Sequence, residues 1–193
     1  MAPGAERAGR DVSAPGAERA VTRAVLSAGS NIGDRLAHLA GVVERFADEV
    51  VSVSPVYSTA PWGGVEQDDF FNITLVVEGP YRASDWLEIG AELEQAADRT
   101  REVRWGPRTL DVDVITVSGA DGVIRSDDPT LTLPHPRAAE RAFVLVPWLA
   151  ADPQAMLWTP QGITPVAELI ERIDPAERAG VVRVADAPGA GSS

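Results

Sequence analysis

The chain has 193 residues and a formal net charge of −12, and every one of its 17 basic residues is an arginine. Because it contains no lysine and no cysteine, it excludes a P-loop phosphate lysine, a Schiff base, a thiolate nucleophile and a cysteine-ligated zinc site. The only two histidines, His38 and His135, are far apart in the sequence, which argues against a histidine-rich transition-metal site. We therefore expect any catalytic metal to be a hard cation held by carboxylates, such as Mg²⁺.

A hydrophobic fraction of 45% with 24% charged residues is typical of one globular domain. No apolar run reaches the length of a membrane helix and no signal peptide is recognisable, so we expect a cytoplasmic protein without membrane contact. The acidic balance also predicts no general affinity for nucleic acid, because duplex binding depends on neutralising phosphates with basic side chains.

The two ends of the chain are predicted to be disordered. Residues 2–7 and 14–19 repeat the sequence Ala-Pro-Gly-Ala-Glu-Arg, which cannot bury enough apolar surface to offset the entropy of ordering. The last residues are rich in Ala, Gly, Ser and Pro. We expect a disordered leader at 1–22, a folded catalytic domain at 23–184 and a disordered tail at 185–193.

Taken in chain order, the folded body begins with a β-prone run at 23–28 and a helix that Asp34 is expected to cap. Two more β-prone runs follow at 50–57 and 70–78, separated by a long loop at 59–69. Loops of that length are usually functional or disordered. The apolar residues at helical spacing in the first helix are Leu36, Leu39, Val43 and Phe46.

A second helix is predicted at 84–97, with Ser84 as its cap, followed by a strand at 110–117. The order of elements is then strand, helix, strand, strand, helix, strand. This order predicts an α+β fold of the ferredoxin-like type, a βαββαβ core with an antiparallel sheet, helices packed on it and long mobile loops. An apolar run at 142–150 and a last helix near 165–173 come after this core.

The strand at 110–117 carries two acidic residues in an otherwise apolar pattern. Since side chains alternate along a strand, Asp111 and Asp113 are expected on one face, roughly 6–7 Å apart, with Leu110, Val112 and Val114 on the other. Such a pair of carboxylates can bracket divalent cations. A bare Asp-x-Asp pair more often simply faces solvent, so this pattern alone is weak.

The segment directly before this strand is rich in arginine. Residues 99–108 contain four arginines against one glutamate, a net charge of +3 in a chain of net −12. Guanidinium groups bind phosphate oxygens in pairs and carboxylates hold Mg²⁺, so the combination predicts a site for a metal-bound polyphosphate. The simpler alternative is a solvated surface loop that pairs with the acidic body, but Trp105, Gly106 and Pro107 within the segment make it the poorer account.

The sequence resembles the 6-hydroxymethyl-7,8-dihydropterin pyrophosphokinase family of folate biosynthesis over about residues 24–150. Four blocks carry the resemblance in the family's order: Gly29-Ser30-Asn31, residues 57–72, residues 104–114 and residues 131–143. The third block, RWGPRTLDVDV, is the most specific. The resemblance implies that the chain transfers pyrophosphate from ATP to the hydroxymethyl group of the dihydropterin and releases AMP.

The resemblance also implies which residues meet ATP. Asp111 and Asp113 match the carboxylates that hold two Mg²⁺ ions on ATP. A catalytic arginine-rich loop is matched by Arg99, Arg101, Arg104 and Arg108, of which Arg99 and Arg108 would contact phosphate. The remaining ATP-binding matches are Glu94, His135 and Arg141 and, through backbone atoms, Val114, Leu131 and Thr132.

For the pterin, the resemblance implies a flat ring stacked between Phe70 and Phe143, with Asn72 reading its polar edge. Backbone atoms of Thr59 and Trp62 would complete the hydrogen bonds, and Trp105 would close over the site. Without the resemblance, core packing is the simpler interpretation of the two phenylalanines. The chain departs from the usual family residues at Ala60, Phe70, Asp98, Thr130 and Pro136.

Two other classes of protein stay open at this point. Asp-x-Asp strands occur in other metal-nucleotide transferases, such as glycosyltransferases, and a ferredoxin-like fold can be a non-catalytic RNA-binding module. The acidic body and the lack of an aromatic RNA-binding motif argue against the second class. We expect a monomer whose partners are ATP and the hydroxymethyl dihydropterin.

Overall fold

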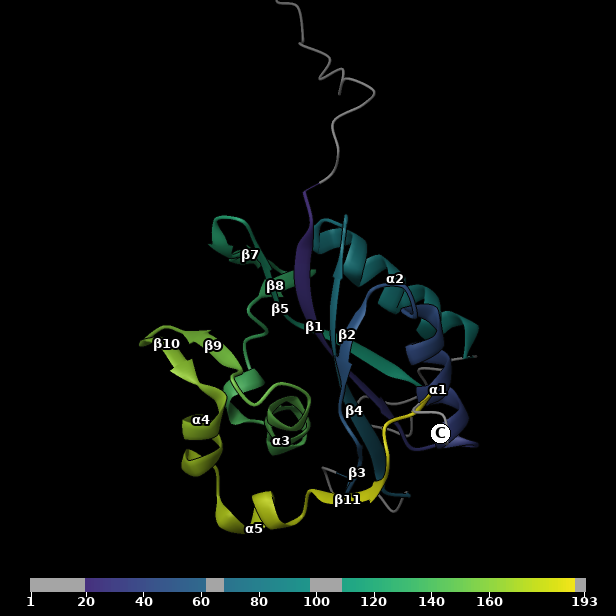
Figure 1. Cartoon of the computed structure of the whole chain (residues 1–193). Coiled ribbons are helices and arrows are strands. Elements are labelled where there is room, and N and C mark those ends of the chain that lie inside the picture. Colours follow the sequence, from purple (N-terminus) through teal and green to yellow (C-terminus); the bar gives the residue numbers. More distant parts are fainter. Residues whose placement is uncertain (1–19, 62–67, 98–108, 190–193) are drawn as a thin grey trace, which may run out of the picture.

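The computed structural model describes residues 20–61, 68–97 and 109–189. In this part of the chain an antiparallel sheet lies in the middle, with helices on both of its sides (Figure 1). None of the described helices is long and apolar enough to cross a membrane. Residues 1–19, 62–67, 98–108 and 190–193 lie outside the described residues. They include most of the predicted leader at 1–22, the middle of the loop predicted at 59–69 and the whole arginine-rich segment at 99–108.

The central strand, β1 (Thr22–Ser30), is paired along both edges. It runs antiparallel to β4 (Phe70–Gly79) on one side and to β5 (Asp111–Gly119) on the other. A strand covered on both faces needs apolar residues on both faces. The apolar residues that β1 buries are Ala24, Val25, Leu26 and Ala28.

The other strands extend the sheet outward from this centre. β2 (Val50–Val53) and β3 (Val56–Thr59) both pair with β4, β11 (Val182–Ala185) pairs with β3, and β6 (Gly122–Val123) pairs with β5. The strand order is β11, β3, β4, β1, β5, β6, with β2 also on β4. The α+β class is therefore confirmed, and the strands follow the order of the split βαβ arrangement.

The predicted single run at 50–57 is wrong, because the structure divides it into β2 and β3. Pro55 has no backbone N–H to donate to a ladder. At the break, the buried Ser54 replaces the ladder hydrogen bonds with two of its own to Thr74: its N–H donates to the Thr74 carbonyl at 2.9 Å, and its Oγ accepts from the Thr74 N–H at 2.9 Å.

β5 changes phase halfway along its length. Its register against β1 shifts between Val25, which pairs with Thr116, and Leu26, which pairs with Val114, so β5 carries one extra residue, a β-bulge. Before the bulge, Val112 and Val114 pack in the core on one side of the sheet and Ile115 on the other. After it, Val117 packs with the first group, where regular alternation would have put it with Ile115.

Helix α1 (Arg35–Arg45) covers one face of the sheet. Asp34 caps it as predicted, with its carboxylate accepting a hydrogen bond from the Ala37 N–H at 3.0 Å. The predicted apolar face is confirmed for Leu39 and Phe46, which are fully buried. It is wrong for Leu36, which is 45% exposed because it lies in the first turn, next to the end of β1.

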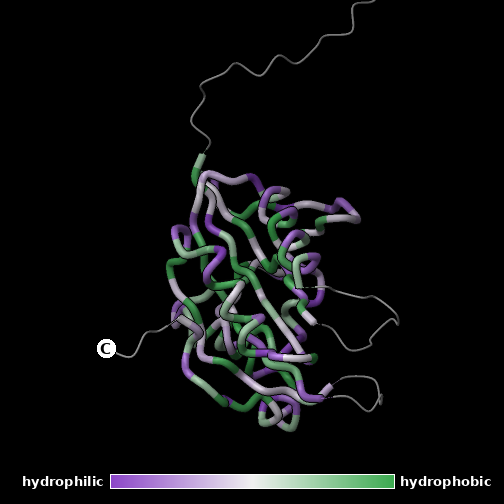
Figure 2. Tube along the Cα trace, turned by 90° about the vertical axis from the view of Figure 1, so that its right-hand side faces the viewer, coloured by the Kyte–Doolittle hydropathy of each residue, from purple (hydrophilic) through white to green (hydrophobic). Residues whose placement is uncertain are grey.

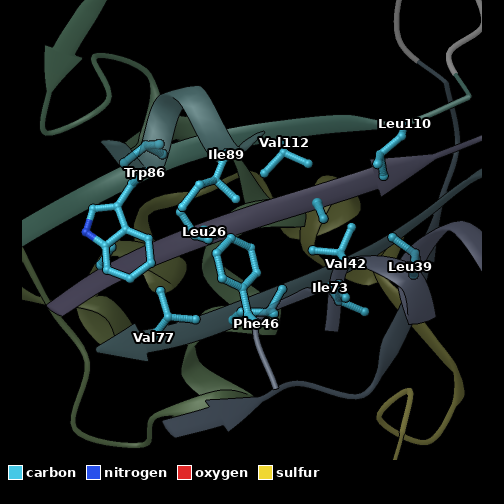
Figure 3. Packing of buried hydrophobic residues seen from close by; sticks show 14 of the residues in the cluster. Leu26, Leu39, Val42, Phe46, Ile73, Val77, Trp86, Ile89, Leu110 and Val112 are labelled. Carbon is cyan, nitrogen blue, oxygen red and sulfur yellow. The ribbon is translucent and has the colours of Figure 1, made fainter. Parts of the chain in front are cut away.

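Helix α2 (Ala83–Ala96) packs beside α1 on the same face (Figure 1). The predicted cap Ser84 is wrong: the N-cap is Arg82, and Asp85 accepts a hydrogen bond from the Arg82 N–H at 2.9 Å. Trp86 anchors α2 in the core, where its ring lies 6.0 Å from that of Phe46 and its Nε1 donates to Thr22 Oγ1 at 2.9 Å (Figure 3).

The opposite face of the sheet is covered by α3 (Ala142–Ala151), in which Val144, Leu145 and Trp148 are buried. Figure 2 shows hydrophobic segments running through the interior, with hydrophilic ones gathered toward the outside. The elements around α3 are α4 (Val166–Arg172), α5 (Pro175–Ala179), a 3₁₀ turn (Ala138–Glu140) and the hairpin of β9 (Met156–Thr159) and β10 (Gly162–Pro165). The hairpin of β7 (Ser126–Asp128) and β8 (Leu131–Leu133) lies near β5, and its Leu133 is buried with the core under α1 and α2.

Trp86→Ala should lower the free energy of unfolding by about 3–5 kcal/mol, because it leaves a cavity between α1, α2 and the sheet. Trp86→Phe keeps an aromatic ring and loses the hydrogen bond to Thr22, so we expect a smaller loss, about 1–2 kcal/mol. Urea unfolding followed by circular dichroism measures both. Equal losses in the two variants would mean that ring packing is not what Trp86 contributes.

Candidate active site

The ends of three neighbouring strands bring polar residues together in one row. In the sheet register, Gly29 of β1 lies between Asn72 of β4 and Asp111 of β5. Two residues earlier along β1, Ser27 lies between Thr74 and Asp113. Since paired residues and residues two apart share a face, the five polar side chains form one patch on the sheet, with Gly29 between them.

The two aspartates point to the face of the sheet that α3 covers. Their neighbours Val112 and Val114 belong to the core under α1 and α2, so Asp111 and Asp113 project to the other side, and both are half-buried. The expectation that they share a face agrees with this register. The structure adds what the face contains, which is the N-terminal end of α3.

Arg141, the residue that precedes α3, joins this end of the helix to the acidic strand. Its Nη1 lies 3.3 Å from Asp113 Oδ2, and its side chain is only 15% exposed. The guanidinium carbon lies 5.5 Å from the centre of the Phe143 ring. One arginine therefore contacts both a predicted metal ligand and a predicted pterin-stacking aromatic.

His135 lies near the same charges. Its backbone N–H donates to the Ile115 carbonyl of β5 at 2.7 Å, which fixes it beside the acidic strand. Burial lowers the pKa of its imidazole below the ordinary 6.5; the carboxylate of Asp113 opposes the shift, and the guanidinium groups of Arg141 and Arg137 add to it. Burial also lowers the pKa of Arg141, with Asp113 opposing, but a guanidinium keeps its charge in proteins.

Glu94 connects α2 to the acidic strand. Its Oε1 accepts a hydrogen bond from the Val112 N–H at 2.9 Å, between the two aspartates in the sequence. Glu94, predicted to contact the nucleotide, thus also holds the backbone of β5. The Val114 side chain is buried in the core, which leaves its backbone as the part that could meet adenine.

The predicted adenine contacts on β8 lie in a short hairpin after β6. β8 pairs with β7, with Asp128 opposite Leu131 and Asp127 opposite Thr132. The Thr132 hydroxyl donates to the Asp128 carbonyl at 3.0 Å, which closes the hairpin. Both predicted residues are half-buried.

Three of the predicted pterin residues, Thr59, Phe70 and Asn72, lie where β3 and β4 meet, whereas Phe143 lies in α3. Thr59 pairs with Phe70, and the Asn72 Nδ2 donates to the Thr59 hydroxyl at 2.9 Å. Asn72 is 4% exposed. A Cβ added to Gly29 would lie 3.0 Å from Asn72 Oδ1, so the glycine lets the amide lie close against β1.

Six predicted site residues lie outside the described part of the chain: Trp62, Arg99, Arg101, Arg104, Trp105 and Arg108. Within residues 20–61, 68–97 and 109–189, no three acidic or histidine side chains gather closely enough to hold a metal ion by themselves. Asp111 and Asp113 are oxygen donors that suit Mg²⁺, which usually takes one or two carboxylates and completes its shell with phosphate oxygens and water.

Two polar residues of this face escaped the sequence analysis. Ser27 and Thr74 are buried next to Asp113 in the register, and the Thr74 hydroxyl has no hydrogen-bond partner in the described structure. The sequence does hint at this face, because Asn72 and Thr74 are two apart in one β-prone run and Ser27 is two residues before Gly29 in another. Only the register shows that these two runs are adjacent.

Solved structures confirm the architecture. A Plasmodium falciparum chain described as wild-type HPPK-DHPS matches with a TM-score of 0.57 over 79% of this chain, at 12% sequence identity. The match covers 44% of that chain, so the present chain spans less than half of its length. At this identity the likeness concerns the fold alone.

Sequence relatives define the family. Residues 25–153 match the family described as 7,8-dihydro-6-hydroxymethylpterin-pyrophosphokinase (HPPK). Proteins named 2-amino-4-hydroxy-6-hydroxymethyldihydropteridine pyrophosphokinase are 45% identical in Mycobacterium tuberculosis, over 83% of this chain and 89% of that protein, and 50% identical in Mycobacterium leprae, over 83% and 88%. The Bacillus subtilis protein of that name is 38% identical over 64% of this chain and 74% of its own length. The chain belongs to this pyrophosphokinase family.

The pKa of His135 should lie below 6.5 in the metal-free protein. Proton NMR titration measures it, with His38→Gln used to assign the two imidazole signals. Just below pH 6.5 the imidazole binds more protons in the unfolded chain than in the folded protein, so protonation favours unfolding. The stability that neutral His135 contributes is therefore complete above pH 6.5 and is lost as the pH falls through the lowered pKa. A titration midpoint at or above 6.5 would contradict the burial that the structure gives this side chain.

Proposed function

We propose that this chain transfers the pyrophosphoryl group of ATP to the hydroxymethyl group of 6-hydroxymethyl-7,8-dihydropterin, releasing AMP, as a step of folate biosynthesis. Membership of the pyrophosphokinase family supports this ATP-dependent diphosphotransferase activity and disfavours another Asp-x-Asp transferase or an RNA-binding module. The structural observation that carries the proposal is the register of Asn72, Gly29 and Asp111. In this register Asn72, expected to bind the pterin, lies one strand away from Asp111, expected to bind the metal ions of ATP.

The reaction needs positioning and charge stabilisation more than covalent chemistry. The hydroxymethyl oxygen attacks the β-phosphorus in line, the bond to the AMP oxygen breaks, and the hydroxyl proton is lost. Two Mg²⁺ ions on Asp111 and Asp113 would neutralise charge on the phosphate oxygens. The lack of lysine and cysteine is compatible with this chemistry, because no Schiff base or thiolate takes part.

On the ATP side, the chain supplies cations around the acidic pair. Arg141, held 3.3 Å from Asp113, and the partly buried His135 are proposed to contact phosphate oxygens. Glu94 holds the β5 backbone between the aspartates, and backbone atoms at Val114, Leu131 and Thr132 would meet adenine. The proposed catalytic arginines, which lie outside the described residues, are Arg99, Arg101, Arg104 and Arg108.

On the pterin side, Phe70 and Phe143 are proposed to stack on the two faces of the ring, and Asn72 to read its polar edge. The hydrogen bond from Asn72 to the Thr59 hydroxyl fixes which atoms of the amide face the site. Backbone at Thr59 and Trp62 would add hydrogen bonds, and Trp105 would exclude water, which could otherwise accept the pyrophosphoryl group. A catalytic domain at 23–184 and a cytoplasmic monomer stay predictions.

The direct test incubates the chain with Mg²⁺, ATP and the hydroxymethyl dihydropterin, and separates the nucleotides. We expect AMP and the pterin diphosphate in equal amounts. Omission of the pterin, or addition of EDTA, should abolish AMP formation. Release of ADP, or AMP formed without the pterin, would refute the proposal, and turnover of a nucleotide sugar in place of ATP would favour a glycosyltransferase.

Asp111→Asn and Asp113→Asn should each lower kcat to near background, because they remove a charge from the proposed metal site without changing side-chain size. Circular dichroism should show an intact fold. Asp121→Asn, beyond the opposite end of β5, is the matched control and should keep normal turnover. Near-normal kcat in either site variant would remove the two-metal role.

Arg108→Ala should slow the chemical step by about 10²–10³-fold through lost stabilisation of transition-state charge. Single-turnover quench at saturating substrates separates this effect from binding. Arg172→Ala, which removes an exposed arginine paired with Glu168 in α4, controls for the general loss of one positive charge. An unchanged single-turnover rate for Arg108→Ala would assign the chemical step to other cations.

A further inference from the structure

The sequence block at the end of β1 contains two residues, Ser30 and Asn31, that the proposed function leaves without a role. Gly29, Ser30 and Asn31 carry part of the family resemblance, yet none of them is among the ATP, metal or pterin residues above. Ser30 and Asn31 are also almost completely buried, with exposures of 0% and 2%. We call residues 29–35 the β1–α1 junction and consider what its side chains bind.

Toward β5, the junction holds the segment that leads into the acidic strand. The Ser30 hydroxyl donates a hydrogen bond to the Thr109 carbonyl at 2.5 Å. Thr109 precedes β5 by two residues, so this bond fixes the backbone just ahead of Asp111. The half-buried Thr109 carbonyl lies outside any strand and has no ladder partner, so its donor must come from elsewhere in the chain. Ser30 is that donor.

Toward β4, the junction holds the segment that leads into the proposed pterin site. Asn31 Nδ2 donates to the Asp68 carbonyl at 3.2 Å, and Arg35 Nη1 donates to the next carbonyl, that of Asp69, at 2.7 Å. The Arg35 guanidinium carbon also lies 3.9 Å from the centre of the Phe71 ring, a cation–π contact. Phe71 stands between the two predicted pterin residues of β4.

We propose that the β1–α1 junction is a positioning element, in which Asn31 and Arg35 set the pterin-contacting start of β4 while Ser30 sets the metal-binding start of β5. The junction is continuous with β1, which pairs with both strands, so one short segment fixes two reacting groups relative to each other. Small displacements of bound reactants cost large factors in rate or affinity. The inference rests on the proposed placement of the pterin against Phe70 and Asn72.

The first test compares Arg35→Met with Arg35→Lys. Methionine keeps a long side chain over Phe71 but has no donor for the Asp69 carbonyl, whereas lysine keeps a cation and a donor. We expect Arg35→Met to raise the KM for the pterin about ten-fold with the KM for ATP unchanged, and Arg35→Lys to restore most of the loss. Arg172→Gln, at the exposed surface of α4, should leave both constants unchanged.

Asn31→Asp replaces the amide donor by a carboxylate of the same size, and should raise the KM for the pterin in the same way. Thermal unfolding is measured first, because Asn31 is buried; if this variant does not fold, the Arg35 pair decides. Both Arg35 variants folded with an unchanged KM for the pterin would overturn the pterin half of the inference. Failure of the unmodified chain to form AMP would instead refute the proposed function.

Ser30→Ala tests the half of the inference that concerns β5. Here we expect the single-turnover rate at saturating substrates to fall about ten-fold, while the KM for the pterin stays near normal. Ser118→Ala, near the far end of β5, is the matched control and should keep the normal rate. A normal single-turnover rate for a folded Ser30→Ala would overturn the role of Ser30.

Discussion

The site depends on one constraint, that β1 is paired on both edges and covered on both faces. Pairing on both edges aligns β4 and β5 with the same strand, so residues about forty positions apart in the chain lie across from Gly29. Toward the ends of these strands the buried apolar residues give way to a polar face that includes Asn72, Asp111 and Asp113. The apolar core of β1 therefore determines where the chemistry can be.

The charge of the chain is divided between its body and its site. The net charge of −12 describes the body, whereas the acidic pair of β5 faces Arg141 and the partly buried His135. Arg141 offsets the charge of Asp113 in the described structure. A metal-bound polyphosphate offers both signs of charge at once, which suits this arrangement better than a polyanion without metals or a free cation would.

Local patterns predicted the parts of the fold that depend on local rules. Alternation along a strand gave the shared face of Asp111 and Asp113, and the Asp34 cap followed from its position before an apolar helix. The strand break at Ser54 and Pro55 was missed, although it follows from the missing backbone donor of proline. The cap formed by Arg82 with Asp85 was also missed, although it follows from a carboxylate near the start of the helix. The row of Asn72, Gly29 and Asp111, and the contacts of Arg35, depend on long-range register, which no single segment of sequence contains.

The bulge in β5 separates two demands on one strand. Before the bulge, the alternation of side chains along β5 turns Asp111 and Asp113 away from the core under α1 and α2. After the bulge, the alternation is shifted so that Val117 points into that core. Without the extra residue, the strand could satisfy only one of these, and either Val117 would leave the core or both aspartates would turn into it. A one-residue change in length on either side of the bulge would therefore turn the side chains beyond it to the opposite face of the sheet.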